Sequence, residues 1–155
     1  MATTIEKVQQ LIQEIGPSMQ DIDAVVQTEE PSWAIQFSDE TIIIIEAIEG
    51  PERMVMSAEI GSADDAIQKP VYETMLCYNM MWRESGGVKI GLAGPKGALI
   101  LSSDLCLEGL TLMDLQESMK RFVKIVRSWK NYVQHSETAA APLPGLSGND
   151  FHLHA

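Results

Sequence analysis

The sequence is poor in basic residues. It contains 11 lysines and arginines against 22 aspartates and glutamates, so its formal net charge at pH 7 is -11. A protein that binds the phosphate backbone of a nucleic acid needs a basic surface, and docking on an anionic lipid surface needs one too. The charge balance therefore argues against both a nucleic-acid partner and a membrane partner.

Cysteines and long apolar runs are also scarce. Cys77 and Cys106 lie in separate segments without Cys-X-X-Cys spacing, which favours two buried thiols in a reducing cytosol over a disulfide or a metal pair. No apolar run reaches the length of about 18 residues that a membrane-spanning helix needs. The first residues lack the basic and apolar regions of a signal peptide. We expect a protein that neither crosses a membrane nor carries such a leader.

A converging set of catalytic groups is missing as well. Neither cysteine has a neighbouring base in the sequence that would activate it as a nucleophile. The segment 94–97, Gly-Pro-Lys-Gly, lacks the spacing of a phosphate loop and joins two predicted strands, so we interpret it as a hairpin turn. His152 and His154 form a His-X-His pair without a third ligand nearby, which favours a solvated tail over a metal site. We expect no enzymatic activity, no metal and no cofactor.

Apolar periodicity predicts three helices and five strands. The order α-β-β-β-α-β-β-α is typical of an α+β fold with a mostly antiparallel, twisted sheet packed by helices. A polar connector follows the first helix, which Gly16-Pro17 ends. We expect a single domain over 1–136 and a flexible C-terminal tail over 137–155. The expected helices lie at 4–15, 66–84 and around 112–133, and the strands at 33–37, 41–48, 53–60, 88–93 and 98–104.

The last predicted helix has the clearest pattern in the chain. Its apolar residues recur at alternating spacings of three and four, which predicts one buried stripe. This stripe consists of Leu112, Leu115, Met119, Phe122, Val126, Trp129 and Val133. A run of basic residues between 120 and 130 lies largely off the stripe. We favour a solvated helix face for this run over a partner-binding surface.

Two segments are more apolar than a small one-layer fold requires. In 71–82 the apolar residues occupy two faces of the predicted helix, so each face should be buried against another surface. In 41–48 both faces of the predicted strand carry large apolar residues. Either both strand faces are covered within the molecule, or one forms an exposed apolar groove for a partner peptide.

The residues around these segments resemble a known family. The stretch MLCYNMMWRESGGVKIGLAGPKGALILSSDL, followed by Gly109, Leu110, Leu112 and a helix that ends in FVKIVRSWKNYV, is similar to class I chaperones of bacterial type III secretion, the Tir-chaperone (CesT-like) family. The likeness covers about residues 3–135. Two departures are a first helix rich in Gln, Ile and Val where relatives often have Leu and Phe, and a long tail.

The resemblance implies a homodimeric chaperone of the bacterial cytoplasm without nucleotide use. Such a protein binds the N-terminal region of a secreted effector in extended form and keeps it soluble and competent for secretion without ATP. The alternative is a regulatory or interaction domain of the same fold that serves no secreted protein. The effector-binding residues implied by the resemblance are Leu11, Ile12, Trp33, Ile35, Phe37, Ile43 and Ile45. The implied dimer interface consists of Val71, Tyr72, Met75, Leu76, Asn79, Met80, Arg83, Val88 and Ile90.

Overall fold

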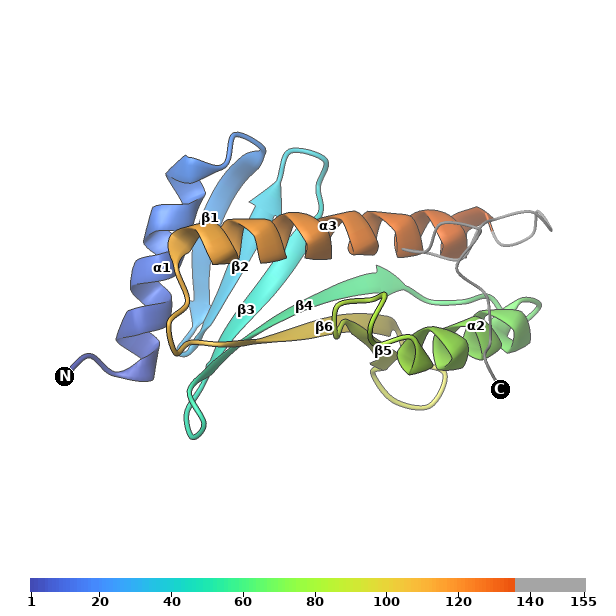
Figure 1. The fold of residues 1–155 in the computed structure, drawn as a ribbon. Helices are drawn as coiled ribbons and strands as arrows, with labels where there is room; N and C mark the ends of the chain where they lie inside the picture. The colour runs from blue at the N-terminus through green and yellow to red at the C-terminus, as the bar shows by residue number, and fades with distance from the viewer. Residues whose placement is uncertain (136–155) are drawn as a thin grey trace. The chain divides into compact units, whose positions relative to one another are not determined.

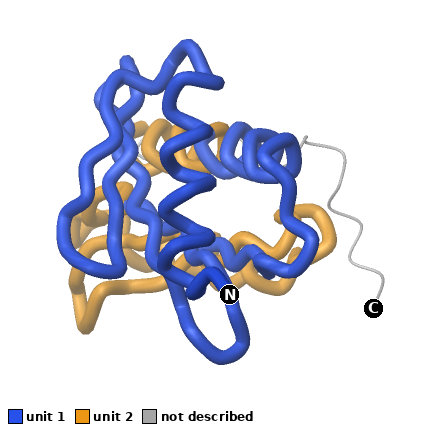
Figure 2. The backbone as a smooth tube through the Cα atoms, turned by 90° about the vertical axis from the view of Figure 1, so that its left-hand side faces the viewer, with its two compact units in different colours: residues 1–58, 102–123 blue, residues 59–101, 124–155 orange. Residues whose placement is uncertain are grey.

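The structure is a computed structural model that describes residues 1–135 (Figure 1). Contacts divide the chain into two compact units, coloured separately in Figure 2. Unit 1 consists of Met1–Ala58 and Ser102–Val123, and unit 2 of Glu59–Leu101 and Lys124–Ala155. The single domain over 1–136 stays a prediction, and the predicted flexible tail lies outside the described residues.

Within residues 1–135 the chain forms three helices and six strands. The strand order in the sheet is β1-β2-β3-β4-β6-β5, and the pairs β1–β2, β2–β3 and β3–β4 are antiparallel. The predicted α+β class with a mostly antiparallel sheet is therefore confirmed. In chain order the elements are α1 (Thr4–Ser18), β1 (Ile22–Glu29), β2 (Ser32–Phe37), β3 (Ile42–Ile48), β4 (Arg53–Gly61), α2 (Gln68–Met80), β5 (Lys89–Leu92), β6 (Leu99–Cys106) and α3 (Leu112–His135).

Strand β1 was not predicted, because the segment that forms it was interpreted as a polar connector. Its apolar residues Ile22, Val25 and Val26 do not alternate with polar ones, so they carry no period of two. The pairing with β2 shifts register between Ile22 and Ala24, as at a β-bulge. A bulge adds one residue to one strand and reverses which face the following side chains take. This register shift therefore explains why the apolar residues of β1 do not alternate regularly in the sequence.

Helix α2 is shorter than the predicted helix over 66–84. It begins at Gln68 with Pro70 in its first turn, where the missing N–H of proline costs little. The residue before it, Ile67, provides no side-chain cap. The helix ends at Met80 and a turn follows, so Trp82 is not a helical residue.

The core of unit 1 lies on one face of its strands. Alternate residues of β2, β3 and β4 are buried, whereas the residues between them are exposed or half-buried. In β3, for example, Ile43 and Ile45 are fully buried, while Ile42 on the other face is 48% exposed. Helix α1 packs against β1 and β3 and adds Val8, Ile12 and Ile15 to this core.

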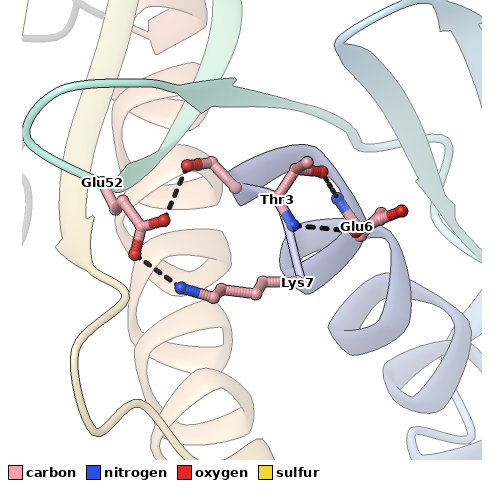
Figure 3. A network of polar contacts seen from close by, with 5 residues as sticks. Thr3, Glu6, Lys7 and Glu52 are labelled. Carbon is pink, nitrogen blue, oxygen red and sulfur yellow. Dashed lines mark hydrogen bonds and ion pairs between the residues drawn. The ribbon is translucent and has the colours of Figure 1, made fainter. Parts of the chain in front are cut away.

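Polar contacts hold the start of α1 (Figure 3). The Thr3 hydroxyl accepts from the backbone N–H of Glu6, and the Glu6 carboxylate accepts from the N–H of Thr3, which forms a capping box. Glu52, just before β4, accepts from Lys7 Nζ at 2.7 Å and from the Thr4 hydroxyl at 2.9 Å. These contacts connect the first turn of α1 to the β3–β4 turn and orient the helix on its strands.

The core of unit 2 contains an aromatic cluster between α2 and the second half of α3. Trp129 is fully buried and meets the rings of Tyr78 and Tyr132 edge to face, with centroid distances of 5.3 and 5.5 Å. The hydroxyls of Tyr132 and Thr74 lie 2.8 Å apart and form a hydrogen bond. The predicted stripe of α3 is buried at every position except Leu112, which is half-buried.

Both cysteines are exposed, so the prediction of two buried thiols is wrong. Cys77 precedes the buried Tyr78 on α2 and lies on the outer side of that helix. Cys106 is the last residue of β6, where burial fades toward the end of the strand. Each cysteine thus lies on the solvent-exposed side of its element. No helix within residues 1–135 has the length and apolarity that membrane crossing requires.

Candidate functional site

The structure places most of the predicted effector-binding residues in the core. Six of the seven side chains are at most 3% exposed, and only Leu11 is half-exposed. The five that lie in strands share one face of the sheet, because residues two apart along a strand point to the same side. The sixth, Ile12, belongs to α1, which packs against β1 and β3. A bound segment that leaves this core intact cannot contact them. The six buried residues are Ile12, Trp33, Ile35, Phe37, Ile43 and Ile45.

A groove in unit 1 is lined by the end of α1 and the start of β1. Its volume of about 370 Å³ is at the lower end of the range of typical ligand sites. Helix α1 continues through Gly16 and Pro17 to Ser18, which is beyond its predicted end and places both residues in the groove wall. The helix approaches the strand closely here, because a Cβ added at Gly16 would lie 3.3 Å from Val25 Cγ2. The lining residues are Ile12, Gln13, Gly16, Pro17, Ile22, Asp23, Ala24 and Val25.

The chemistry of this α1–β1 groove is mixed. Half-buried Ile22, Ala24 and Val25 provide an apolar floor, while Gln13 and Asp23 are exposed. A carboxylate at the rim favours a cation beside any apolar group that enters. The groove also adjoins the edge of the sheet, because β1 is the first strand in the order and pairs only with β2 among the described strands. An edge strand has backbone N–H and C=O groups that another strand can pair with.

The opposite edge of the sheet, β5 in unit 2, is partly closed by a side chain. Asn79 of α2 donates to the carbonyl of Ile90 at 2.8 Å and accepts from the Ile90 N–H at 2.9 Å. The amide thus replaces both bonds that a neighbouring strand would make to Ile90. The role that the resemblance implied for Asn79, in the dimer interface, differs from the contact that the structure gives it. Since β5 is blocked at this residue, β1 is the more open edge.

Replacing Asn79 with alanine should destabilise the protein by about 1–2 kcal/mol, because two hydrogen bonds to the backbone of the buried Ile90 are lost. Urea unfolding followed by circular dichroism measures the change. Cys77→Ala is the matched control, since Cys77 is an exposed residue of the same helix, and its effect should stay within about 0.5 kcal/mol. Equal stabilities of the two variants would contradict a closing role for Asn79.

The predicted dimer residues fall into two groups. Val71, Met75, Val88 and Ile90 are at most 6% exposed and belong to the core of unit 2. Tyr72 is half-buried and Arg83 is exposed. Val71 and Met75 lie on the buried face of α2, whereas Ile90 lies in β5 and Val88 directly precedes that strand. All four side chains are therefore already buried within one copy of the chain.

An exposed apolar surface remains on the outer side of α2. Leu76 and Met80 are 69% and 79% exposed, and Trp82 just beyond the helix is 61% exposed, with the Arg83 guanidinium 5.0 Å from its ring centre. We call these three apolar residues the α2 surface. Trp82 was not predicted as a site residue, and the signal that could have found it is its place at the end of the apolar run 71–82. Large apolar side chains this exposed commonly mark a contact with another protein.

The ionisable groups with altered pKa values have structural explanations. The hydrogen bond from Lys7 lowers the pKa of Glu52, with a further contribution from Thr4. Hydrogen bonds from Thr111 lower the pKa of Asp114 at the start of α3. Burial raises the pKa of Tyr78 to about 12. None of the three lines the α1–β1 groove, and no group of three or more potential metal ligands occurs within residues 1–135.

Comparison with known proteins assigns this architecture to a family. Three solved structures share the fold: an ExsC–ExsE complex (16% identity, TM-score 0.70, 86% of this chain and 97% of that chain covered), a HopA1–SchA chaperone–effector complex (14%, 0.65, 84% and 98%) and the Yersinia pestis type III secretion chaperone SycH with a YscM2 fragment (16%, 0.58, 82% and 99%). Among curated proteins no match was found. The model of the Tir chaperone protein (CesT) family matches residues 10–130, and the chain belongs to this family.

Proposed function

We propose that the protein is a type III secretion chaperone that binds the N-terminal region of a secreted effector in extended form. The observation that carries this proposal is family membership over residues 10–130, together with an accessible groove beside an open strand edge. Solved relatives with this fold include a chaperone–effector complex. The protein would keep its effector soluble and competent for secretion in the bacterial cytoplasm, without ATP.

The α1–β1 groove is the part of unit 1 best suited to hold such a segment. An extended chain that pairs with β1 would satisfy the backbone groups of that edge strand. Alternate side chains of the added strand point to one face, so one apolar side chain can enter the groove. The carboxylate of Asp23 at the rim favours a lysine or arginine next to this apolar residue. The bound segment should therefore combine apolar and basic residues.

The working form that we propose is a homodimer held by the α2 surface. Leu76, Met80 and Trp82 of one copy would cover the same residues of a second copy, as in a two-fold interface. Such a contact would bury the second apolar face of residues 71–82, which a single copy leaves exposed. The buried face of α2 remains in unit 2 in this arrangement.

Co-expression tests the proposed function. The protein should co-purify, without added nucleotide, with the N-terminal segment of a secreted protein encoded beside it, and should raise the soluble yield of that segment. A truncated form of the secreted protein that lacks its N-terminal region is the control and should not co-purify. If no neighbouring secreted protein binds, the chaperone function is wrong, and a regulatory or interaction domain of the same fold is favoured.

Gln13→Trp should fill the groove and reduce effector co-purification at least about tenfold, because the segment loses its apolar pocket. Gln13 is exposed, so the substitution should leave the core intact. The matched control is Gln10→Trp, which introduces the same side chain at an exposed position of α1 outside the groove. Equal retention of the effector by both variants would show that the groove is not the binding site.

A further inference from the structure

A second pocket of unit 1 lies beside the start of α1. Its volume of about 490 Å³ is within the range of typical ligand sites. Three segments that are far apart in the sequence line it: Lys7 of α1, Pro51 and Glu52 of the β3–β4 turn, and residues 106–109 at the end of β6 and just after it. All three segments belong to unit 1. We call this cavity the α1–β6 pocket.

Glu52 connects the three walls of the α1–β6 pocket. Its carboxylate accepts from Lys7 Nζ at 2.7 Å and from the Thr4 hydroxyl at 2.9 Å (Figure 3). Its backbone carbonyl accepts from the N–H of Leu107 at 3.3 Å. Because each wall is bonded to the same residue, the pocket is formed before any partner binds, and binding has a low cost in conformational order.

The charge of this pocket comes from Glu108. Lys7 and Glu52 form an ion pair and largely cancel each other's charge. Glu108 is exposed and has no hydrogen bond or ion pair with any residue within 1–135. Pro51 and the buried Leu107 add apolar surface to the lining. A carboxylate next to apolar surface favours a cation on an apolar stem, as in lysine and arginine side chains.

The openness of the pocket favours a protein segment over a small molecule. A small-molecule site buries most of the surface of its ligand. Five of the seven lining residues are exposed here, and only Leu107 is buried, so the pocket suits a side chain whose main chain continues across the surface. Residues 1–58 also contain 11 acidic residues, and their only two basic ones, Lys7 and Arg53, are in ion pairs. This surface attracts a basic segment.

We propose that the α1–β6 pocket binds a lysine or arginine side chain of an extended protein segment that is both basic and apolar. The cation pairs with Glu108, and a neighbouring apolar side chain contacts Pro51 and Leu107. This inference rests on the proposed function where it takes the segment to be part of the effector, and it adds a contact outside the α1–β1 groove.

The two sites lie on different sides of α1. Lys7 of the pocket and Gly16 of the groove are nine positions apart, which is about 180° around the helix and about 14 Å along it. An effector segment that fills both sites therefore has to pass over α1. At least about five residues of extended chain separate the two side chains that it inserts.

The two cysteines allow a site-specific test. Cys106 lines the pocket, whereas Cys77 is exposed in unit 2. The probe is a six-residue peptide of alternating leucine and lysine, and mass spectrometry follows alkylation of the full-length protein by iodoacetamide. At about ten times its Kd the peptide should slow alkylation of Cys106 about tenfold and leave the rate at Cys77 unchanged. The leucine–glutamine peptide and free arginine should protect neither thiol.

Three variants assign the protection to the pocket. Glu108→Gln should raise the Kd of the peptide about threefold, as expected for one exposed charge pair. The matched control is Glu117→Gln, which removes the same charge at an exposed position of α3 outside the pocket and should change the Kd less than about 1.5-fold. In Gln13→Trp, which fills the α1–β1 groove, protection of Cys106 should persist.

Three results would overturn the proposal. They are equal effects of Glu108→Gln and Glu117→Gln, equal protection of Cys106 by free arginine or by the leucine–glutamine peptide, and no protection at peptide concentrations up to about 1 mM. Because the probe is not an effector, the test does not depend on the proposed function. If the peptide protects Cys106 but no effector co-purifies, the chaperone function is wrong and the pocket assignment stands.

Discussion

Replacing Leu76 and Met80 with glutamate should convert the homodimer that we propose into monomers. Both side chains are more than two thirds exposed in one copy, so the substitutions leave the core of unit 2 intact. In a two-fold contact each change would place a carboxylate against the same carboxylate of the other copy, in an apolar setting. Burying unpaired charges costs several kcal/mol, which weakens the dimer more than about a hundredfold.

Light scattering after size-exclusion chromatography measures the result. The unmodified protein should have twice the 17.1 kDa mass of the chain, and the double variant should have the mass of one chain. Met113→Glu is the matched control, because Met113 is 67% exposed on α3 and does not belong to the α2 surface. A double variant that stays dimeric would show that the interface lies elsewhere.

Trp129→Ala should lower the free energy of unfolding by about 3–5 kcal/mol, the largest stability effect expected for this protein. The indole is fully buried and packs edge to face against Tyr78 and Tyr132. Its removal leaves a cavity between α2 and the second half of α3 and ends both ring contacts. Since domains are stable by about 5–15 kcal/mol, the variant loses a large part of its margin.

Tyr132→Phe is the control within the same cluster. It keeps the ring next to Trp129 but removes the hydroxyl that meets Thr74, so it should cost only about 1 kcal/mol. Urea unfolding followed by far-ultraviolet circular dichroism compares the two variants, and thermal unfolding detects a Trp129→Ala variant that is only partly stable at room temperature. Similar losses in both would contradict a central packing role for Trp129.

Most of the secondary structure could be predicted from periodicity. In strand β2, Trp33, Ile35 and Phe37 recur with a period of two, and α3 repeats its apolar residues at spacings of three and four, because each pattern reflects burial on one face of a regular element. Strand β1 could not be found in this way. Its register shift moves side chains from one face to the other within the strand, and this depends on pairing with β2, which lies outside any local window.

The candidate site was less predictable than the fold. The residues implied for effector binding are the most apolar of their strands, and for that reason they are buried, as Ile35 and Phe37 are. The α1–β1 groove consists of residues with ordinary properties, such as Gly16 and Ala24, that come together only where α1 meets β1. The dimer role that the resemblance implies for Asn79 stays a prediction, and its contact with the Ile90 backbone, 11 positions away in the sequence, appears only in the tertiary structure.

The sequence by itself determined the α+β class, the buried stripe of α3 and the need of residues 71–82 for two covers, since these follow from local spacing of apolar residues. Only the tertiary structure decided which of the two apolar faces is buried within one copy of the chain. It buries Val71, Met75 and Tyr78 and leaves Leu76 and Met80 exposed. A helical pattern states how many faces are apolar, but which face is buried depends on the surface that packs against it.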